Sequence, residues 1–473
     1  MTECNCEQLE FHGLGRRAVV ARFDGGAIST DGGALLLREV EAKTGLLAAV
    51  AEQFTDYRDP ELIEHTAGEL VSQRIMGLAL GYADLNDHDR LRFDPLLAVA
   101  SGKGDPTGRD RRREQDRGKA LASSSTLNRL ELTPADADGE ARYKKIVADQ
   151  AGLDRVLVEH FIQSHDTPPD TLWLDLDATD DPLHGHQEGR FFHGYYGHYC
   201  YLPLYITSGE HVLCARLRRS DIDAAAGSVE ELTRIVGQLR AAWPQVRIII
   251  RGDSGFCRED IMAWREAEGI DFVLGLAKND RLKAMSLRWR IDAQQAFLDT
   301  CESSRVFGEL KYRTRKTWRR ARRVVVKAEH LAKGANPRYV VTSLSAEEAD
   351  ARTLYEDLYC ARGDMENRIK EQQLELFADR TSTQTMRANQ LRLTLSTVAY
   401  TLLVALRRLG LQDTELERAT PGNIRMRLLK VGAQVRVSVR RVVVALSEAF
   451  PAQNVFMQAA RNLAALPARA SPG

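Results

Sequence analysis

Two aspartates each follow a short apolar run of the chain. Asp177 ends residues 172–177, and Asp253 comes two positions after residues 246–251. Apolar runs of this length, bounded by turn-forming residues, predict β-strands. Strands of an open α/β sheet gather ligand-binding side chains at their carboxyl ends, so both carboxylates are expected at one sheet edge. Carboxylates that lie so close repel unless a cation lies between them, and oxygen-only sites favour Mg²⁺ or Mn²⁺.

A third carboxylate lies in residues 351–377, whose pattern predicts one long helix. Intervals of three, four and four residues place four of its side chains on one helix face: Tyr359, Arg362, Glu366 and Lys370. A solvated charged face is the ordinary alternative for this set, and a turn or helix N-cap is the ordinary alternative for either aspartate alone. The pairing of the two strand-end aspartates favours a metal site, whereas the residues alone leave both interpretations of the helix face open.

Other aspartates compete for the first position. Asp175 faces the same side of its strand as Asp177, because side chains two residues apart in a strand point the same way. Asp180 and Asp181 lie beyond the strand and ahead of Pro182, where turn residues are expected.

The elements that must position these residues alternate between strand and helix. We predict strands at 172–177, 201–207, 211–217, 246–251 and 272–276, with helices at 229–242 and 258–267. Three antiparallel strands followed by parallel strands with helical crossovers form an RNase H-like arrangement of the α/β class.

At 473 residues the chain is too long for one core, so several domains are expected. We predict an N-terminal mostly helical DNA-binding domain (1–167), with helices at 35–44, 61–80 and 153–163. The RNase H-like core follows in two parts (168–278 and 346–409), interrupted by a β-rich insertion (279–345) with strands at 323–327 and 338–342. A C-terminal region (410–473) would serve DNA binding or dimerisation. Residues 127–131, after a run of serines, could form a recognition helix or a plain structural one.

The three carboxylate segments resemble the catalytic motifs of the DDE transposases of bacterial insertion sequences. Asp177 is followed by Ala and Thr, Asp253 follows an apolar strand, and the helix reads Tyr359-x-x-Arg362-x-x-x-Glu366. The stretches Gly-Tyr-Tyr-Gly (194–197) and Ser-Thr-Asp-Gly-Gly (29–33) point more narrowly to insertion-sequence family thirteen-eighty. The resemblance spans residues 28–409.

This resemblance implies two Mg²⁺ or Mn²⁺ ions held by Asp177, Asp253 and Glu366, with Asp177 touching both. One ion would activate a water or a 3′-hydroxyl and the other would stabilise the leaving oxygen. Tyr359 and Arg362 would contact DNA phosphates near the cut. The Asp-x-Thr pattern selects Asp177 over Asp175.

The helix departs from the family motif at one position. The family has a lysine seven residues after the glutamate, and this chain has Gln373. Glutamine can hydrogen-bond a phosphate but supplies no charge. Whether Lys370, on the same face, replaces the motif lysine is left open.

A basic strip between Lys311 and Lys327 stands out in a chain whose 66 basic and 66 acidic residues balance. It holds Arg315, Arg319 and Arg320 beside Tyr312 and Trp318, and contains no acid. Basic side chains with interleaved aromatics favour nucleic-acid contact over a solvated hairpin. In the resembling family an insertion-domain Trp holds a flipped base, and Trp318 is the candidate here.

Other metal chemistry and a membrane location are not indicated. The histidines between His184 and His198 lack a Cys-x-x-Cys or His-Glu-x-x-His partner motif, and Cys4-x-Cys6 has no second pair, which argues against zinc. Seven scattered cysteines predict reduced thiols in the cytoplasm. No signal peptide is visible, and the apolar run 393–406 is too short for a bilayer, which predicts a buried helix.

We therefore expect a DNA transposase that cuts double-stranded DNA at terminal inverted repeats and transfers the 3′ ends into target DNA. A dimer on DNA is expected, because the two ends of the transposon must be held together. No nucleotide cofactor is expected. Two alternatives remain: a protein that binds transposon ends without cutting, and a structure-selective nuclease of the same fold.

Overall fold

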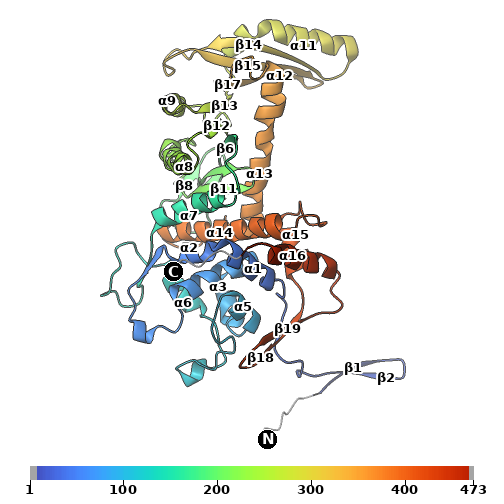
Figure 1. Ribbon diagram of the computed structural model, residues 1–473. Coiled ribbons are helices and arrows are strands. Elements are labelled where there is room, and N and C mark those ends of the chain that lie inside the picture. The colour runs from blue at the N-terminus through green and yellow to red at the C-terminus, as the bar shows by residue number, and fades with distance from the viewer. Residues whose placement is uncertain (1–7, 468–473) are drawn as a thin grey trace. The chain divides into compact units, whose positions relative to one another are not determined.

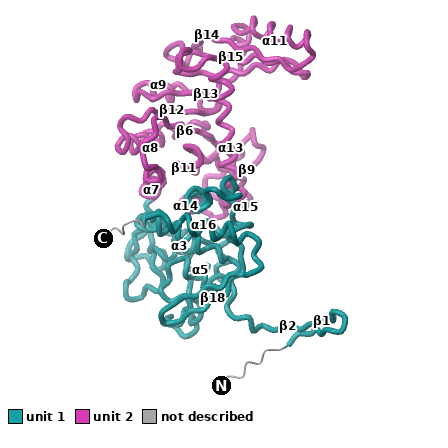
Figure 2. The backbone as a smooth tube through the Cα atoms, turned by 45° about the vertical axis from the view of Figure 1, so that its right-hand side comes forward, with its two compact units in different colours: residues 1–149, 398–473 teal, residues 150–397 magenta. Residues whose placement is uncertain are grey.

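The computed structural model describes residues 8–467. The chain divides into two compact units, residues 1–149 with 398–473 (unit 1) and residues 150–397 (unit 2), as Figure 2 shows. Helix α14 (Met386–Gly410) begins in unit 2 and ends in unit 1. The domain boundaries expected at 167, 278, 345 and 409 stay predictions.

Unit 2 is built on one mixed sheet with the strand order β11-β10-β6-β12-β13-β17-β15-β14, and the short β16 pairs with β15. β10 is antiparallel to both β11 and β6, whereas β6, β12 and β13 run parallel. β17 then pairs antiparallel with β13 and β15. The strand bounds are β6 (Thr171–Ala178), β10 (Leu204–Ser208), β11 (His211–Arg216), β12 (Arg247–Gly252), β13 (Asp271–Leu276), β14 (Ser304–Tyr312), β15 (Arg322–Leu331), β16 (Gly334–Ala335) and β17 (Arg338–Thr342).

Both faces of this sheet are buried. Ile248 and Ile250 of β12 point into one core, where α7 (Gln150–Gln163), α8 (Ser228–Ala242) and α9 (Glu259–Glu268) pack. Ile249 points into a second core with Leu354 and Tyr355 from the opposite side. Figure 1 shows α8 and α9 on one side of the sheet and α13 on the other. Burial on both faces explains why the central strands read as nearly continuous apolar runs.

The predicted alternation of strands and helices in the core is confirmed, each element within a few residues of its expected bounds. The segment 279–345 contains the two expected strands, β15 and β17, as parts of the same sheet. It also contains two helices that we did not predict, α10 (Asp280–Met285) and α11 (Leu287–Thr300).

The predicted helix 351–377 is present, but its winding changes along its length. It starts as α12 (Ala351–Thr353), widens to a π-helix in η4 (Leu354–Tyr359), tightens to 3₁₀ in η5 (Cys360–Arg362), and continues as α13 (Gly363–Lys370) and the π-helical η6 (Glu371–Glu375). π-helical turns inside helices are frequent at functional sites.

Unit 1 is mainly helical, and a small sheet joins an N-terminal segment to a C-terminal one. Strand β3 (Ile28–Ser29) pairs with β18 (Ala433–Val437), which pairs with β19 (Val442–Leu446). Gly33 donates its backbone N–H to Leu429 at 3.1 Å, and a side chain at Gly33 would collide with the backbone of Leu429. The Ser-Thr-Asp-Gly-Gly stretch therefore joins the N-terminal and C-terminal segments of unit 1.

The helices of unit 1 match the expected ones with one difference. α1 (Ala34–Thr44) agrees with the prediction, but α3 (Ala67–Ala79) starts six residues later than the expected residue 61. Thr66 accepts from the backbone of Glu69, whose side chain bonds back to Thr66, and this capping box fixes the start. The remaining helices and strands are α2 (Leu46–Ala51), α4 (His88–Leu91), α5 (Pro95–Ala100), α6 (Ser124–Glu131), α15 (Pro421–Ile424), α16 (Gln453–Ala465), β1 (Leu9–Leu14), β2 (Arg17–Ala21), β4 (Phe54–Asp56) and β5 (Ile146–Ala148).

Within residues 8–467, none of the helices combines the length and the apolar character that crossing a membrane requires. The apolar run 393–406 lies in α14, and most of its side chains are buried, as predicted.

Candidate active site

Asp177 and Asp253 lie at the same edge of the central sheet. In the parallel pair β6 and β12, Gly252 lies opposite Leu176. Asp253 follows Gly252 and Asp177 follows Leu176, so the two aspartates are neighbours across the strands. Strand pairing thus brings together two carboxylates that are 76 positions apart in sequence (253 − 177). This is the edge where we expected them.

The carboxylate of Asp177 is shielded from solvent and partly satisfied by hydrogen bonds. Its Oδ1 accepts the backbone N–H of Ala178 at 2.9 Å, and its Oδ2 accepts from Arg362 at 3.0 Å. Burial raises the pKa of Asp177 to about 6, Arg362 opposes the rise, and the nearby charge of Asp253 adds to it. Asp253 itself accepts the backbone N–H of Gly255 at 2.8 Å.

Arg362 links the sheet edge to the helix. Its Nη1 donates to Asp177, and its Nη2 donates to Oε1 of Glu366 at 2.8 Å. The side chains of Arg362 and Asp177 are 15% and 17% exposed, whereas that of Glu366 is 49% exposed. The guanidinium therefore neutralises two of the three candidate carboxylates.

The donor set fits a hard divalent cation, because it consists of carboxylate oxygens alone. With Arg362 in this position, however, the carboxylates do not converge on one point. Across residues 8–467, no group of three or more His, Cys, Asp or Glu side chains is arranged to hold a metal ion.

Tyr359 also reaches the site, from the π-helical segment η4. Its hydroxyl approaches Gly275 of β13 so closely that a Cβ added there would lie 2.5 Å from it, beside the backbone of Asp253 and Ser254. Burial raises the pKa of Tyr359. Of the predicted helix face, the structure gathers Tyr359, Arg362 and Glu366 at the site, while Lys370 is exposed further along the helix.

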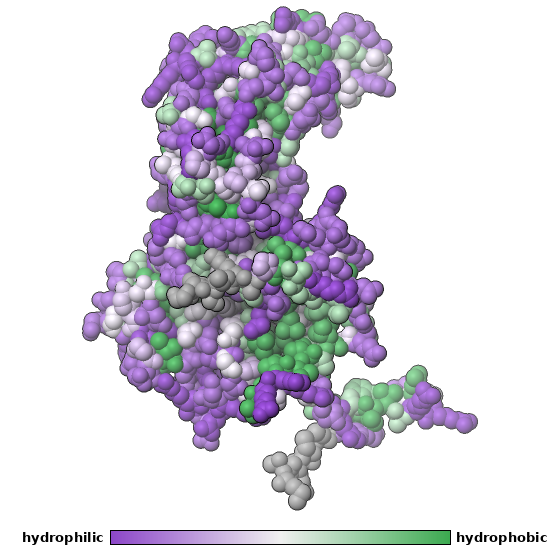
Figure 3. Space-filling model, in the orientation of Figure 1, coloured by the Kyte–Doolittle hydropathy of each residue, from purple (hydrophilic) through white to green (hydrophobic). Residues whose placement is uncertain are grey.

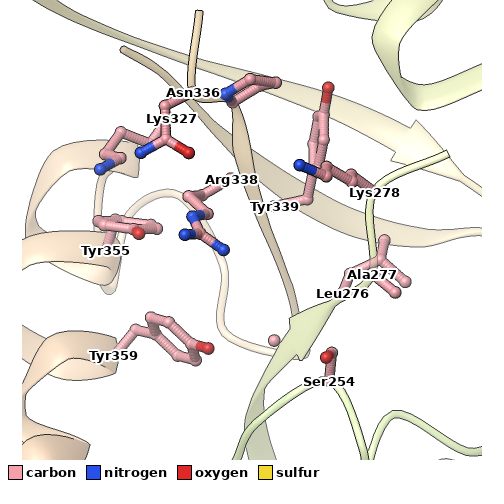
Figure 4. Close-up of a pocket in the computed structure, with 12 residues that line it drawn as sticks. Ser254, Leu276, Ala277, Lys278, Lys327, Asn336, Arg338, Tyr339, Tyr355 and Tyr359 are labelled. Carbon is pink, nitrogen blue, oxygen red and sulfur yellow. The ribbon is translucent and has the colours of Figure 1, made fainter. Parts of the chain in front are cut away.

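A cavity of about 560 Å³ opens beside Tyr359 and Ser254. Figure 4 shows Tyr355 and Tyr359 on one side of it, with Arg338 reaching between them and the opposite wall. Three cationic side chains line it, and none of its described lining residues is acidic: Lys278, Lys327 and Arg338 are the cations, with Ser254, Gly275, Leu276, Ala277, Asn336, Pro337, Tyr339, Tyr355 and Tyr359. The cavity thus offers positive charge and aromatic rings next to the carboxylates.

Gln373 does not face the carboxylate site. Its side-chain amide donates to the backbone oxygen of Asp180 at 3.1 Å and to Oδ1 of Asp181 at 2.9 Å. Asp181, interpreted from the sequence as a turn residue, is fully buried in β7 (Asp181–Pro182). Burial raises the pKa of Asp181 to about 8, and the Gln373 hydrogen bond only partly opposes this.

Asp175 has a separate role. It is 4% exposed and receives two hydrogen bonds from Arg251, from Nε at 2.5 Å and from Nη2 at 2.8 Å. Arg251 also donates to the backbone oxygen of Leu358, next to Tyr359. The Asp175–Arg251 pair therefore connects β6 and β12 to the helix. Because Asp175 is already paired with Arg251, Asp177 is the better candidate for the site.

Sequence reasoning missed Tyr196 near the site and considered His198 only as a zinc ligand. Tyr196, in the Gly-Tyr-Tyr-Gly turn between β8 (Phe191–His193) and β9 (His198–Tyr201), lies in the field of Asp180 and Asp177, and burial with these charges raises its pKa to about 12. His198 bonds the carboxylate of Asp180 at 2.7 Å. The turn was used only as a family signature, and its aromatic content was the available signal.

The basic strip is partly neutralised in three dimensions. Arg320 and Arg322 pair with Glu266 of α9. The segment itself contains no acid, but an acid from another part of the chain lies beside it in the folded protein. Arg315 and Arg319 are exposed in the loop between β14 and β15. Trp318 is 7% exposed and packs edge-on against Tyr312, so stacking on a base would require its release.

Among residues 8–467, no group of three or more histidines, cysteines and carboxylates could hold a metal ion. The described cysteines, Cys200, Cys214, Cys257, Cys301 and Cys360, are free thiols. Cys4 and Cys6 lie outside the described residues.

The chain is similar to known transposases in sequence pattern and in structure. A family model described as "Transposase DDE domain group 1" matches residues 11–468. No curated protein matches the chain. Among solved structures, the chain is similar to one described as the cryo-EM structure of piggyBac transposase synaptic complex with hairpin DNA, with 11% sequence identity, a TM-score of 0.38, and coverage of 94% of this chain and 87% of that one.

Proposed function

The chain belongs to the family of transposase DDE domain group 1, and from this premise we propose that it is an active DNA transposase of a bacterial insertion sequence. In this proposal it binds terminal inverted repeats, cleaves the DNA strands and joins the 3′ ends to target DNA. The narrower assignment to insertion-sequence family thirteen-eighty is part of the same proposal. Two copies would act together on DNA, since each transposon has two ends.

The observation that carries the proposal is the sheet edge that Asp177 and Asp253 share, together with the hydrogen bonds of Arg362 to Asp177 and Glu366. These side chains come from two strands and one helix. Glu366 follows Asp253 by 113 positions in the sequence (366 − 253). A purely structural role does not explain why two carboxylates share this edge, because their charges disfavour each other.

The strand order supports an RNase H-like core. β11, β10 and β6 form an antiparallel set, and β12 and β13 continue from β6 in parallel. We predicted this combination for such a core, with the sheet edge at Asp177 and Asp253 as its active site.

In the mechanism we propose, Asp177, Asp253 and Glu366 hold two Mg²⁺ or Mn²⁺ ions. When bound, these ions supply activation of the attacking oxygen and stabilisation of the leaving one. Arg362 turns from the carboxylates to a DNA phosphate, for which its planar guanidinium is well suited. Tyr359, held against Gly275, fixes the position of the DNA backbone relative to Asp253.

The remaining basic residues extend the path for DNA. Arg338, Lys278 and Lys327 line the cavity next to Tyr359 and would accept the backbone of the strand beside the cut. Arg315 and Arg319 are exposed for further phosphate contacts, and Arg320 joins them after leaving Glu266. Lys370 and Gln373 stay candidates for DNA contact.

The test uses the full-length protein, Mg²⁺, and duplex DNA carrying the inverted repeats that flank the gene. We expect strand cleavage at the repeat ends, followed by strand-transfer products. Asp253→Asn should reduce both to background, whereas Asp260→Asn, at an exposed position of α9, should leave both unchanged.

Two other outcomes would replace the proposal. Binding of the repeats without cleavage by the unmodified protein would identify an end-binding protein. Cleavage of DNA without the repeats, and without any strand-transfer product, would identify a structure-selective nuclease.

A further inference from the structure

The hairpin formed by β1 and β2 exposes all of its strand residues. The strands pair antiparallel from Leu9 with Ala21 to Leu14 with Arg17, and every position of both is exposed. Phe11 is 58% exposed and Leu14 is 72% exposed. In the described part of the chain nothing buries either face. Because an isolated two-stranded hairpin is marginally stable in water, this one needs a partner.

The charge of the hairpin identifies the kind of partner. Its turn holds Gly15 and Arg16, Arg17 is the first residue of β2, and the paired strands contain one acid, Glu10 at the end far from the turn. Gly15 adopts a left-handed backbone with φ 61°, which allows the tight turn. Figure 3 shows hydrophobic residues along the hairpin and hydrophilic ones at its far end. An apolar ribbon with a cationic tip is complementary to a polyanion.

A second hairpin of unit 1 also carries arginines at its turn, although its strand β18 is partly buried and pairs with β3. The turn between β18 and β19 holds Val439, Arg440 and Arg441, and Val439 is fully exposed. No acid occurs from Arg418 to Ser447. Two hairpins of one unit thus place adjacent arginines at their tips, and this shared positive charge disfavours their pairing with each other across two copies of the chain.

We propose that the β1–β2 hairpin is a DNA-binding ribbon that enters a groove of duplex DNA. The major groove of B-DNA admits a two-stranded β-ribbon, and a groove contacts both faces, as the exposure of this hairpin demands. Arg16 and Arg17 bind phosphates, and Leu14 and Phe11 lie against bases and sugars. This inference rests on the proposed action on DNA.

The experiment measures binding of fluorescent repeat-end duplex to the full-length protein in EDTA, over a series of salt concentrations. Arg16→Ala and Arg17→Ala should each weaken binding and lower the slope of log K against log salt by about 1, since each removes one phosphate contact. Leu14→Ser should weaken binding and leave the slope unchanged. Arg38→Ala, at an exposed position of α1, is the matched control and should alter neither quantity.

Unchanged affinity and slope in both arginine variants would overturn the proposal. If the same variants instead convert a dimer into monomers in sedimentation, the hairpin serves a second copy of the chain, which also overturns it. The cleavage assay separates this result from the proposed function. If the arginine variants bind and cleave DNA normally, the ribbon proposal is rejected and the transposase proposal stands. If DNA binding depends on the hairpin but the protein cleaves no DNA, the transposase proposal is rejected and the ribbon proposal stands.

Discussion

Arg362 donates from Nη1 to Oδ2 of Asp177 over 3.0 Å, across 185 positions of sequence. This ion pair joins the helix that carries Glu366 to the strand that carries Asp177. It also places a positive charge beside a partly buried carboxylate whose charge would otherwise be costly. The protein without metal therefore carries its own counter-charge at the proposed active site.

We expect Arg362→Gln to destabilise the protein without metal and to strengthen Mn²⁺ binding. Loss of the guanidinium leaves Asp177 shielded and unpaired, which costs about 1–3 kcal/mol in the free energy of unfolding. Mn²⁺ then meets no competing cation, so it should raise the Tm of the variant more than that of the unmodified protein. Thermal unfolding in EDTA and in Mn²⁺ measures both effects. An equal rise in Tm for the two proteins would show that Arg362 and the metal do not compete.

Gly275→Ala should impair DNA cleavage by displacing Tyr359. The added Cβ would lie 2.5 Å from the tyrosine hydroxyl and 3.0 Å from the backbone nitrogen of Ser254. The tyrosine side chain can move away, but the backbone of Asp253 and Ser254 must also shift by a few tenths of an ångström, so we expect a loss of stability together with a large fall in the cleavage rate. Gly237→Ala on α8, where a Cβ meets nothing within 4 Å, is the control. Normal cleavage by Gly275→Ala would remove Tyr359 from the proposed mechanism.

Asp175 and Asp177 should separate in their effects. Asp175→Asn breaks the buried pair with Arg251 and leaves a shielded guanidinium without its partner, so we expect a loss of about 3–5 kcal/mol in the free energy of unfolding. Asp177→Asn should abolish the Mn²⁺-dependent rise in Tm while costing less stability. Urea unfolding and Mn²⁺ titrations of both variants provide the measurement. Loss of metal binding in Asp175→Asn, with the fold intact, would reverse the assignment of the two residues.

The strand-end carboxylates could be predicted from sequence because strand periodicity and strand ends are local properties. Asp177 and Asp253 were expected at one edge, and the pairing of β6 with β12 places them there. The long helix was also predictable, but its changes of winding at residues 354–362 were not, since an apolar periodicity near 3.6 does not distinguish short π and 3₁₀ turns from α-helix.

Contacts between distant segments could not be read from the sequence. The side chain of Arg362 was assigned to DNA, yet in the protein alone it bonds Asp177 and Glu366. Arg322 belonged to an apparently uncompensated basic strip, and Glu259 and Glu266 of α9 neutralise it. Such pairings depend on tertiary approach, for which one sequence carries no periodic signal.

The pH dependence of stability should identify Asp181 as a carboxyl group that is protonated near neutral pH. Burial raises the pKa of Asp181 to about 8, whereas the ordinary value is 3.8. The folded state thus binds the proton more tightly than the unfolded state. The resulting stabilisation is full below pH 3.8 and is lost as the pH rises through about 8, at a slope on the order of 1 kcal/mol per pH unit in between.

Urea unfolding at pH 5 to 9 should therefore show a steeper fall in stability for the unmodified protein than for Asp181→Asn, which keeps an oxygen acceptor for Gln373 and has no proton to lose. Gln373→Lys tests the ionisation of Asp181 by changing its hydrogen-bond donor. The ammonium would favour the charged carboxylate and lower the pKa of Asp181, so stability should no longer fall between pH 6 and 8. This exchange also restores the lysine of the family motif, so it asks whether that lysine balances a buried aspartate or contacts DNA. Parallel pH profiles for all three proteins would mean that Asp181 is ionised throughout this range and that Gln373 does not interact with its charge.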